Sequence, residues 1–67
     1  MKILVNGEER SVQTGTTAAQ IARSLSSRPS GLGLAVAVNG EVVPRRSWDM
    51  VLHERDRVEI LSAAQGG

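Results

Sequence analysis

The residues with the clearest chemical potential in this 67-residue sequence lie at its C-terminal end, which reads Gln65-Gly66-Gly67. The chain has no cysteine, and its single histidine, His53, has no companion at the spacing of a metal site. No serine stands in a recognisable nucleophile motif, and no glycine-rich loop has the pattern that cradles phosphate. We therefore expect no catalytic residue, no bound cofactor and no metal, and the carboxylate of Gly67 becomes the candidate reactive group.

A terminal carboxylate becomes reactive when an enzyme activates it. Attack on a carboxylate would have to expel oxide, whereas a carboxyl group joined to AMP has a good leaving group and can accept sulfur as a thiocarboxylate. Glycine has no Cβ, so Gly66 and Gly67 let the backbone enter a narrow active site. Residues 63–67, if extended, reach about 16–18 Å from a globular body. Without cysteine, no side chain could carry sulfur as a persulfide.

The composition argues against several other classes of function. Eight Lys and Arg against seven Asp and Glu give a net charge of +1, and Trp48 is the single aromatic residue, so nucleic-acid binding is not expected. The longest apolar run, residues 34–38, is far shorter than the roughly 20 residues that span a bilayer, and no signal-peptide core follows Met1. We expect a cytoplasmic protein that does not bind membranes, and the lack of cysteine fits that reducing compartment.

The expected elements begin with a hairpin and a helix. Residues 3–5 and 9–13 should form two strands around Asn6-Gly7, a strong signal for a tight hairpin turn. Thr17 stands three residues before Gln20, the spacing of a capping box at a helix start. The apolar positions that follow have the spacing of one helical face, and they are Ala18, Ile21, Ala22 and Leu25.

A second hairpin, a long connection and a last strand complete the expected order. Asn39-Gly40 is again a type I′ turn signal, and Pro44 ends the strand that follows it. The remaining expected segments are strands at residues 34–38 and 41–43, a connection at 45–56 with a helical turn near Trp48, and a strand at 58–61. Two hairpins, one helix and a separate last strand predict the α+β class.

Several segments resemble the sulfur-carrier proteins of thiamine thiazole biosynthesis, which are relatives of ubiquitin and of the small subunit of molybdopterin synthase. The similar segments are Lys2–Gly7, Gly15 with Thr17, Ala37–Arg45 followed by Trp48, residues 56–61, and Gly66-Gly67. The resemblance implies a β-grasp (ubiquitin-like) fold, a five-stranded mixed sheet with one main helix across one face. We expect one domain over residues 1–62 and a flexible tail over residues 63–67 that ends in Gly-Gly.

The resemblance also implies that the chain is a protein co-substrate and not an enzyme. A ubiquitin-activating-type adenylyltransferase would use ATP and Mg²⁺ to adenylate Gly67, with Gly66 needed for access. Sulfur from a persulfide donor would then form a thiocarboxylate, which thiazole synthase would accept. The alternatives are a related carrier for molybdopterin or cysteine synthesis, a ubiquitin-like protein modifier, and a β-grasp interaction module with an incidental glycine end.

Four further residues each have a structural and a functional interpretation. Arg45 and Arg46 either help to attract an acidic partner or form a solvated pair beside a turn. Trp48 is expected to pack in a half-buried position rather than to contact a partner. Arg55 stands where similar proteins have glycine before the last strand, and the polar run at 53–56 favours an ordinary type I turn over a left-handed Arg55.

Overall fold

The computed structural model describes residues 1–26 and 33–62 of the chain. The elements in these two segments follow in the predicted order of hairpin, helix, hairpin, connection and strand. Their bounds are β1 Lys2–Val5, β2 Glu8–Ser11, α1 Ala18–Leu25, β3 Leu34–Val38, β4 Glu41–Val43, the 3-10 helix η1 Arg45–Ser47, and β5 Arg57–Ser62. The prediction placed β2 at 9–13 and the helical turn nearer Trp48, so both segments lie slightly earlier than expected.

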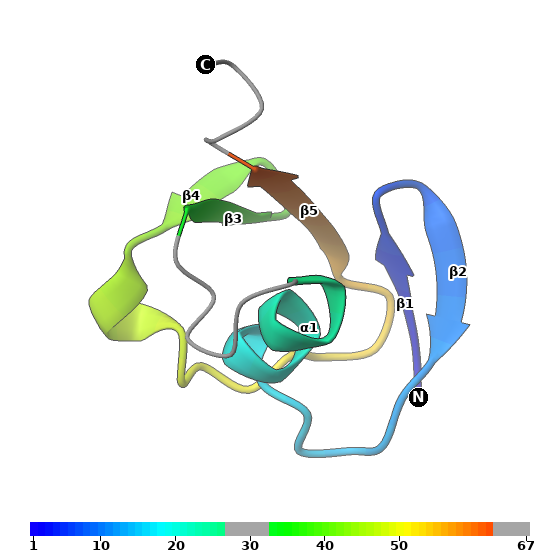
Figure 1. Ribbon diagram of the computed structural model, residues 1–67. Coiled ribbons are helices and arrows are strands. Elements are labelled where there is room, and N and C mark those ends of the chain that lie inside the picture. The colour runs from blue at the N-terminus through cyan, green and yellow to red at the C-terminus, as the bar shows by residue number, and fades with distance from the viewer. Residues whose placement is uncertain (27–32, 63–67) are drawn as a thin grey trace.

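The five strands form one mixed sheet in the order β2-β1-β5-β3-β4. β5 lies at the centre, parallel to β1 and antiparallel to β3, while each hairpin supplies one antiparallel pair. Figure 1 shows α1 lying across one face of this sheet. The last strand therefore sits between the two hairpins, and the expected α+β fold of β-grasp type is confirmed.

Helix α1 begins at the predicted capping box. The Thr17 hydroxyl accepts a hydrogen bond from the Gln20 N–H at 3.2 Å, and the Gln20 side chain accepts one from the Thr17 N–H at 2.9 Å. Ala18, Ile21 and Ala22 are buried against the sheet, while Leu25 in the last turn is 40% exposed. No helix in the described segments is long and apolar enough to cross a membrane.

Alternating residues of the strands supply the core between sheet and helix. Side chains of β1, β3, β4 and β5 on the helix side are buried, and Trp48 and Leu52 from the connection join them. Burial of each large apolar side chain contributes about 1.5–3 kcal/mol, which must suffice in so small a domain. Trp48 is only 5% exposed, so it packs as predicted but more deeply than half-buried, and its Nε1–H donates to the Val43 carbonyl at 3.1 Å.

Both hairpin turns have the conformation that their sequences predict. Type I′ turns need positive φ at both central residues. Asn6 and Gly7 have φ of 51° and 83°, and Asn39 and Gly40 have φ of 53° and 85°. The two turns are therefore type I′, and each places its asparagine at the first left-handed position.

Candidate functional site

The predicted reactive end of the chain, Gly66 and Gly67, lies outside the described residues, as does the whole predicted tail at 63–67. The described part contains the strand that leads to it. β5 is the central strand of the sheet and ends at Ser62. The sequence that carries the candidate group therefore continues directly from the central strand of the sheet. The role of Gly66 and Gly67 stays a prediction.

The first half of β5 is held on the β1 side by main-chain and side-chain hydrogen bonds. The Leu4 N–H donates to the Asp56 carbonyl and the Asn6 N–H donates to the Val58 carbonyl, both at 2.9 Å. The Asn6 side-chain oxygen then accepts the Ile60 N–H at 2.8 Å. The turn residue that ends β1 thus also fixes β5.

The second turn asparagine holds β5 from the β3 side. The Asn39 N–H donates to the Arg57 carbonyl at 2.7 Å, and the Arg57 N–H donates back to the Asn39 side-chain oxygen at 2.9 Å. The Asn39 amide nitrogen donates to the Asp56 carboxylate at 2.9 Å. Both asparagines were predicted as turn residues, but their side-chain hydrogen bonds to β5 were not predicted. The signal in the sequence is asparagine, rather than glycine, at the first position of each turn.

The turn before β5 differs from the turn favoured by the sequence. Arg55 has φ of +68°, and the Asp56 N–H donates to the His53 carbonyl at 3.1 Å. Positive φ at the third residue of a four-residue turn is the pattern of type II, where glycine is usual, and not of type I. The Arg55 N–H also donates to the Lys2 carbonyl at 2.6 Å. The expectation of an ordinary type I turn is therefore wrong, because a bond to the distant β1 selects the left-handed conformation.

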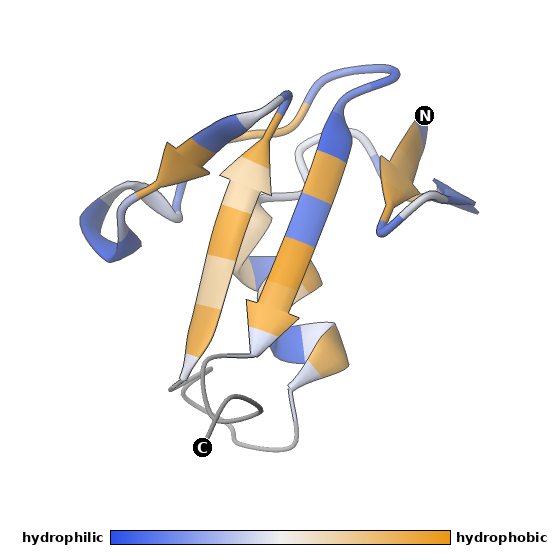
Figure 2. Ribbon diagram, turned by 90° about the horizontal axis from the view of Figure 1, so that it is seen from above, coloured by the Kyte–Doolittle hydropathy of each residue, from blue (hydrophilic) through white to orange (hydrophobic). Residues whose placement is uncertain are grey.

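An apolar strip lies on the face of the sheet opposite α1. It consists of Ala35, Ala37, Val42 and Leu61, and we call it the outer strip. Ala35 pairs with Leu61, and Ala37 pairs with Val42. Val42 is 77% exposed and Leu61 is 69% exposed, although both lie in strands. Figure 2 views the molecule with β3 and β5 in front of α1 and shows β3 in apolar colours, while β5 has hydrophilic and apolar bands and becomes apolar toward its end. Neighbouring exposed apolar side chains often mark an interaction surface.

Arg45 and Arg46 lie in η1, directly after the edge strand β4. The Arg45 guanidinium carbon is 4.7 Å from the centroid of the Trp48 ring, a cation–π contact that orders this side chain. Arg46 is exposed. The structure therefore gives Arg45 a packing role, which the interpretation as a solvated pair did not include, while a partner contact by either arginine stays a prediction.

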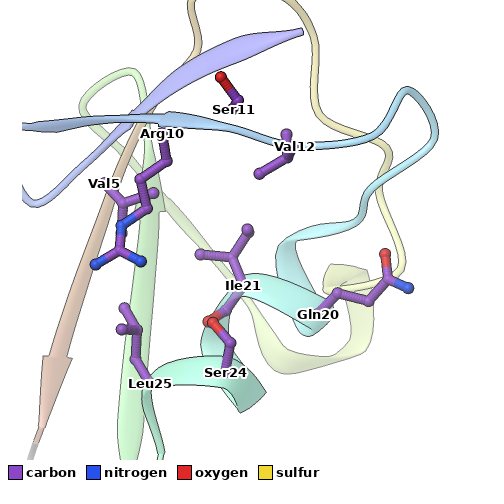
Figure 3. Close-up of a pocket in the computed structure, with 8 residues that line it drawn as sticks. All are labelled: Val5, Arg10, Ser11, Val12, Gln20, Ile21, Ser24 and Leu25. Atoms are coloured by element: carbon purple, nitrogen blue, oxygen red, sulfur yellow. The ribbon is translucent and has the colours of Figure 1, made fainter.

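A groove of about 450 Å³ lies between β2 and α1 (Figure 3). Val5, Val12 and Ile21 line it with apolar groups, and Arg10 lies at its side in the close-up. The nearby Ser24 hydroxyl donates to the Ile21 carbonyl at 2.7 Å, so it is engaged within the helix. The groove offers a contact surface rather than a set of reacting groups.

The mixed sheet with its central last strand and the helix across one face define a small protein of ubiquitin-like fold. The model of the ThiS family matches residues 3–67, and the chain belongs to this family. The chain is also similar to the crystal structure of the thiamine biosynthesis protein ThiS from Geobacter metallireducens, with a TM-score of 0.76 and 26% identity over 92% of this chain and 93% of that chain. No curated protein matches the sequence.

Proposed function

We propose that the protein is a sulfur carrier that donates sulfur, as a thiocarboxylate on Gly67, to the synthesis of the thiamine thiazole. The observation that carries this proposal is the family match, which extends to the terminal glycine. The similar protein of known structure is named as a thiamine biosynthesis protein, which supports the same assignment. In this role the chain is a co-substrate and not an enzyme.

The chemistry takes place in two stages at one carboxyl group. A ubiquitin-activating-type adenylyltransferase binds ATP and Mg²⁺, the Gly67 carboxylate attacks the α-phosphorus, and pyrophosphate leaves. A persulfide sulfur then attacks the carbonyl carbon and AMP departs with one former carboxylate oxygen. Reduction of the resulting S–S bond by a thiol releases the thiocarboxylate, and thiazole synthase accepts the sulfur.

The chain's own contribution is presentation of this group. The first half of β5 is fixed by Asn6 and Asn39, so the globular body gives the tail a rigid base. Gly66 lets the tail enter a narrow site because it carries no Cβ. The outer strip reaches this strand at Leu61, directly before the end of β5, and offers an apolar surface for transient docking.

Intact-mass spectrometry tests the proposal. The protein is incubated with a matching adenylyltransferase, ATP, Mg²⁺, a persulfide donor and a thiol. We expect exchange of one oxygen for sulfur, and fragmentation should place the sulfur on Gly67. Modification of another residue, or no modification with several adenylyltransferases that act on similar carriers, would contradict the proposal.

A second experiment separates the thiazole role from other carrier roles. The isolated thiocarboxylate is presented to thiazole synthase with its other substrates, and in parallel to the large subunit of molybdopterin synthase. Sulfur transfer to the thiazole alone supports the proposal. Transfer to molybdopterin alone would support the sulfur-carrier chemistry but contradict the proposed role in thiazole synthesis.

A further inference from the structure

No strand of the described residues pairs with the second half of β5 on the side where β1 ends, and we call this side the open edge. β1 pairs with β5 only through Leu4 with Arg57 and Val5 with Val58, because the chain turns away at Asn6-Gly7. β5 itself continues to Ser62. Figure 2 shows β5 running past the β1 hairpin while β3 accompanies it on the other side.

The hydrogen bonds on this edge follow the parallel pattern and then stop. In a parallel ladder, one residue donates to one carbonyl of its neighbour strand and accepts from the N–H two residues further on. Asn6 does this with Val58 and Ile60, but its side-chain oxygen replaces the main-chain carbonyl as the acceptor. The next step of the ladder needs a residue that would donate to the Ile60 carbonyl and accept the Ser62 N–H.

No described residue supplies that step. The main-chain groups of Glu59 and Leu61 face β3, because Asn39 is bonded to Arg57 and the antiparallel pattern alternates from there. The Ile60 carbonyl and the Ser62 N–H therefore face the opposite side, where no strand of the described segments continues. One donor and one acceptor are thus presented together immediately before the tail.

We propose that an extended segment of the adenylyltransferase pairs with this edge, so that one of its residues bridges the Ile60 carbonyl and the Ser62 N–H. The inference rests on the proposed function and adds a recognition site to it. Main-chain pairing with an exposed strand edge reads backbone and not side chains. It would set the direction and register of the chain that continues from Ser62 toward Gly67.

Leu61 gives this pairing an apolar side. Its side chain is 69% exposed on the outer face, between the two residues whose main-chain groups face the open edge. A partner strand placed there would cover part of the outer strip at the same time. The open edge and the outer strip then form one continuous binding surface along the end of β5.

Proline and alanine at position 62 separate backbone recognition from side-chain recognition. Ser62→Pro removes the N–H that faces the open edge, and proline is tolerated in a strand where the N–H does not serve the ladder. Ser62→Ala removes the hydroxyl and keeps the N–H. We expect Ser62→Pro to raise the KM of the chain for adenylation about tenfold. Ser62→Ala should leave KM within about twofold of the unchanged protein, a change well under 1.4 kcal/mol.

Equal KM values for the proline and alanine variants would overturn the inference. Thermal unfolding of both variants checks that the fold is retained. Adenylation of the unchanged protein is measured in the same assay. If that protein is adenylated and the two variants do not differ, the edge pairing is wrong and the carrier function stands; if it is not adenylated, the proposed function itself fails.

Amide hydrogen exchange gives a test that needs no substitution. The Ser62 amide should exchange more slowly in the complex with the adenylyltransferase than in the free protein. The Glu9 amide is the matched control, because it faces the outer edge of β2, where Val12 and Arg10 point their main-chain groups to β1. Protection at Glu9 without protection at Ser62 would overturn the proposal. Concentration-dependent protection of Ser62 without enzyme would identify a second copy as the occupant, which also overturns it.

Discussion

The two halves of β5 are held in very different ways. The first half has a strand on each side, and the side chains of Asn6 and Asn39 close the ladder where the neighbouring hairpins turn away. The second half has β3 on one side and, within residues 1–26 and 33–62, no strand on the other. Within one strand, the structure thus separates a part that is paired on both sides from a part that is paired on one side in the described residues.

This difference explains how a small domain can present its end without weakening its core. Val58 and Ile60 bury their side chains under α1, whereas Leu61 between Ile60 and Ser62 is exposed. The buried side chains of β5 therefore all come before its last two residues. Changes beyond that point should affect partners far more than folding.

Deletion of Gly67 gives the largest expected effect. It tests whether the segment that follows the second half of β5 serves partners rather than folding. The chain then ends in a carboxylate one residue too short for the partner's active site, so we expect adenylation to fall below detection. We expect the free energy of unfolding to change by well under 1 kcal/mol. Since 1 kcal/mol moves the melting temperature of a domain of this size by roughly 4–8 °C, the melting temperature should stay within about 2 °C. Pyrophosphate exchange and calorimetry measure the two quantities. A large loss of stability would show that the end of the chain packs on the body.

Removal of the Asn6 side chain tests whether the hydrogen bonds that hold the first half of β5 stabilise the fold. Asn6→Gly keeps the positive φ but leaves the partly buried Ile60 N–H without its acceptor, so we expect a loss of about 1–2 kcal/mol in the free energy of unfolding. Asn6→Ala should lose about 1 kcal/mol more than Asn6→Gly, since alanine, unlike glycine, has a Cβ in the left-handed region and lacks the polar side chain that lets asparagine adopt it. Urea unfolding measures both losses. If the two variants were equally stable, φ would contribute nothing and our division of the effect would be wrong.

The turn before β5 allows a stabilising substitution. Arg55→Gly removes the strain of a left-handed arginine, roughly 1–2 kcal/mol, against a smaller loss from the added freedom of the unfolded chain. We expect a net gain of about 1 kcal/mol in the free energy of unfolding. Asn39→Gly is the matched control, because it places glycine at a similar φ but removes side-chain bonds and should destabilise. A neutral or destabilising Arg55→Gly would mean that the arginine side chain contributes to the fold.

Reversal of charge beside the β4 edge should give the smallest effect. Arg46→Glu leaves the contact of Arg45 with Trp48 intact, and it should slow association with an acidic partner severalfold at low salt and weaken the salt dependence of the rate. Arg23→Glu makes the same change in net charge on the exposed side of α1 and should alter the rate less. Stopped-flow association at two salt concentrations measures this. Equal rates for the two variants would assign Arg46 to the solvated surface.

Local sequence signals were sufficient for most of the fold. Short apolar runs and the Asn-Gly pairs located the strands, Thr17 and Gln20 located the helix start, and the two Asn-Gly pairs predicted their turn type. The position of β5 between the hairpins was not encoded locally and came from resemblance to known proteins. Strand pairing between residues more than fifty positions apart leaves no periodicity that a reader of the sequence could detect.

The turn before β5 depends on a contact that is distant in the sequence. The residues around Arg55 suit a type I turn, and the left-handed conformation is selected by the bond from its N–H to the Lys2 carbonyl. The same applies to the site. The Gly-Gly end could be read from the sequence, but the open edge at Ile60 and Ser62 follows from where β1 turns away, which is a property of the assembled sheet.

The central place of β5 also has a consequence for biosynthesis. The strand follows both hairpins and α1 in the chain, yet these elements depend on it for a continuous core. A nascent chain therefore cannot complete its fold while this strand is still enclosed by the ribosome, and a product terminated before Arg57 lacks the strand that joins its two halves. Such products expose unpaired strand edges and are open to proteolysis. Only chains that include β5 can therefore complete the fold and escape this proteolysis.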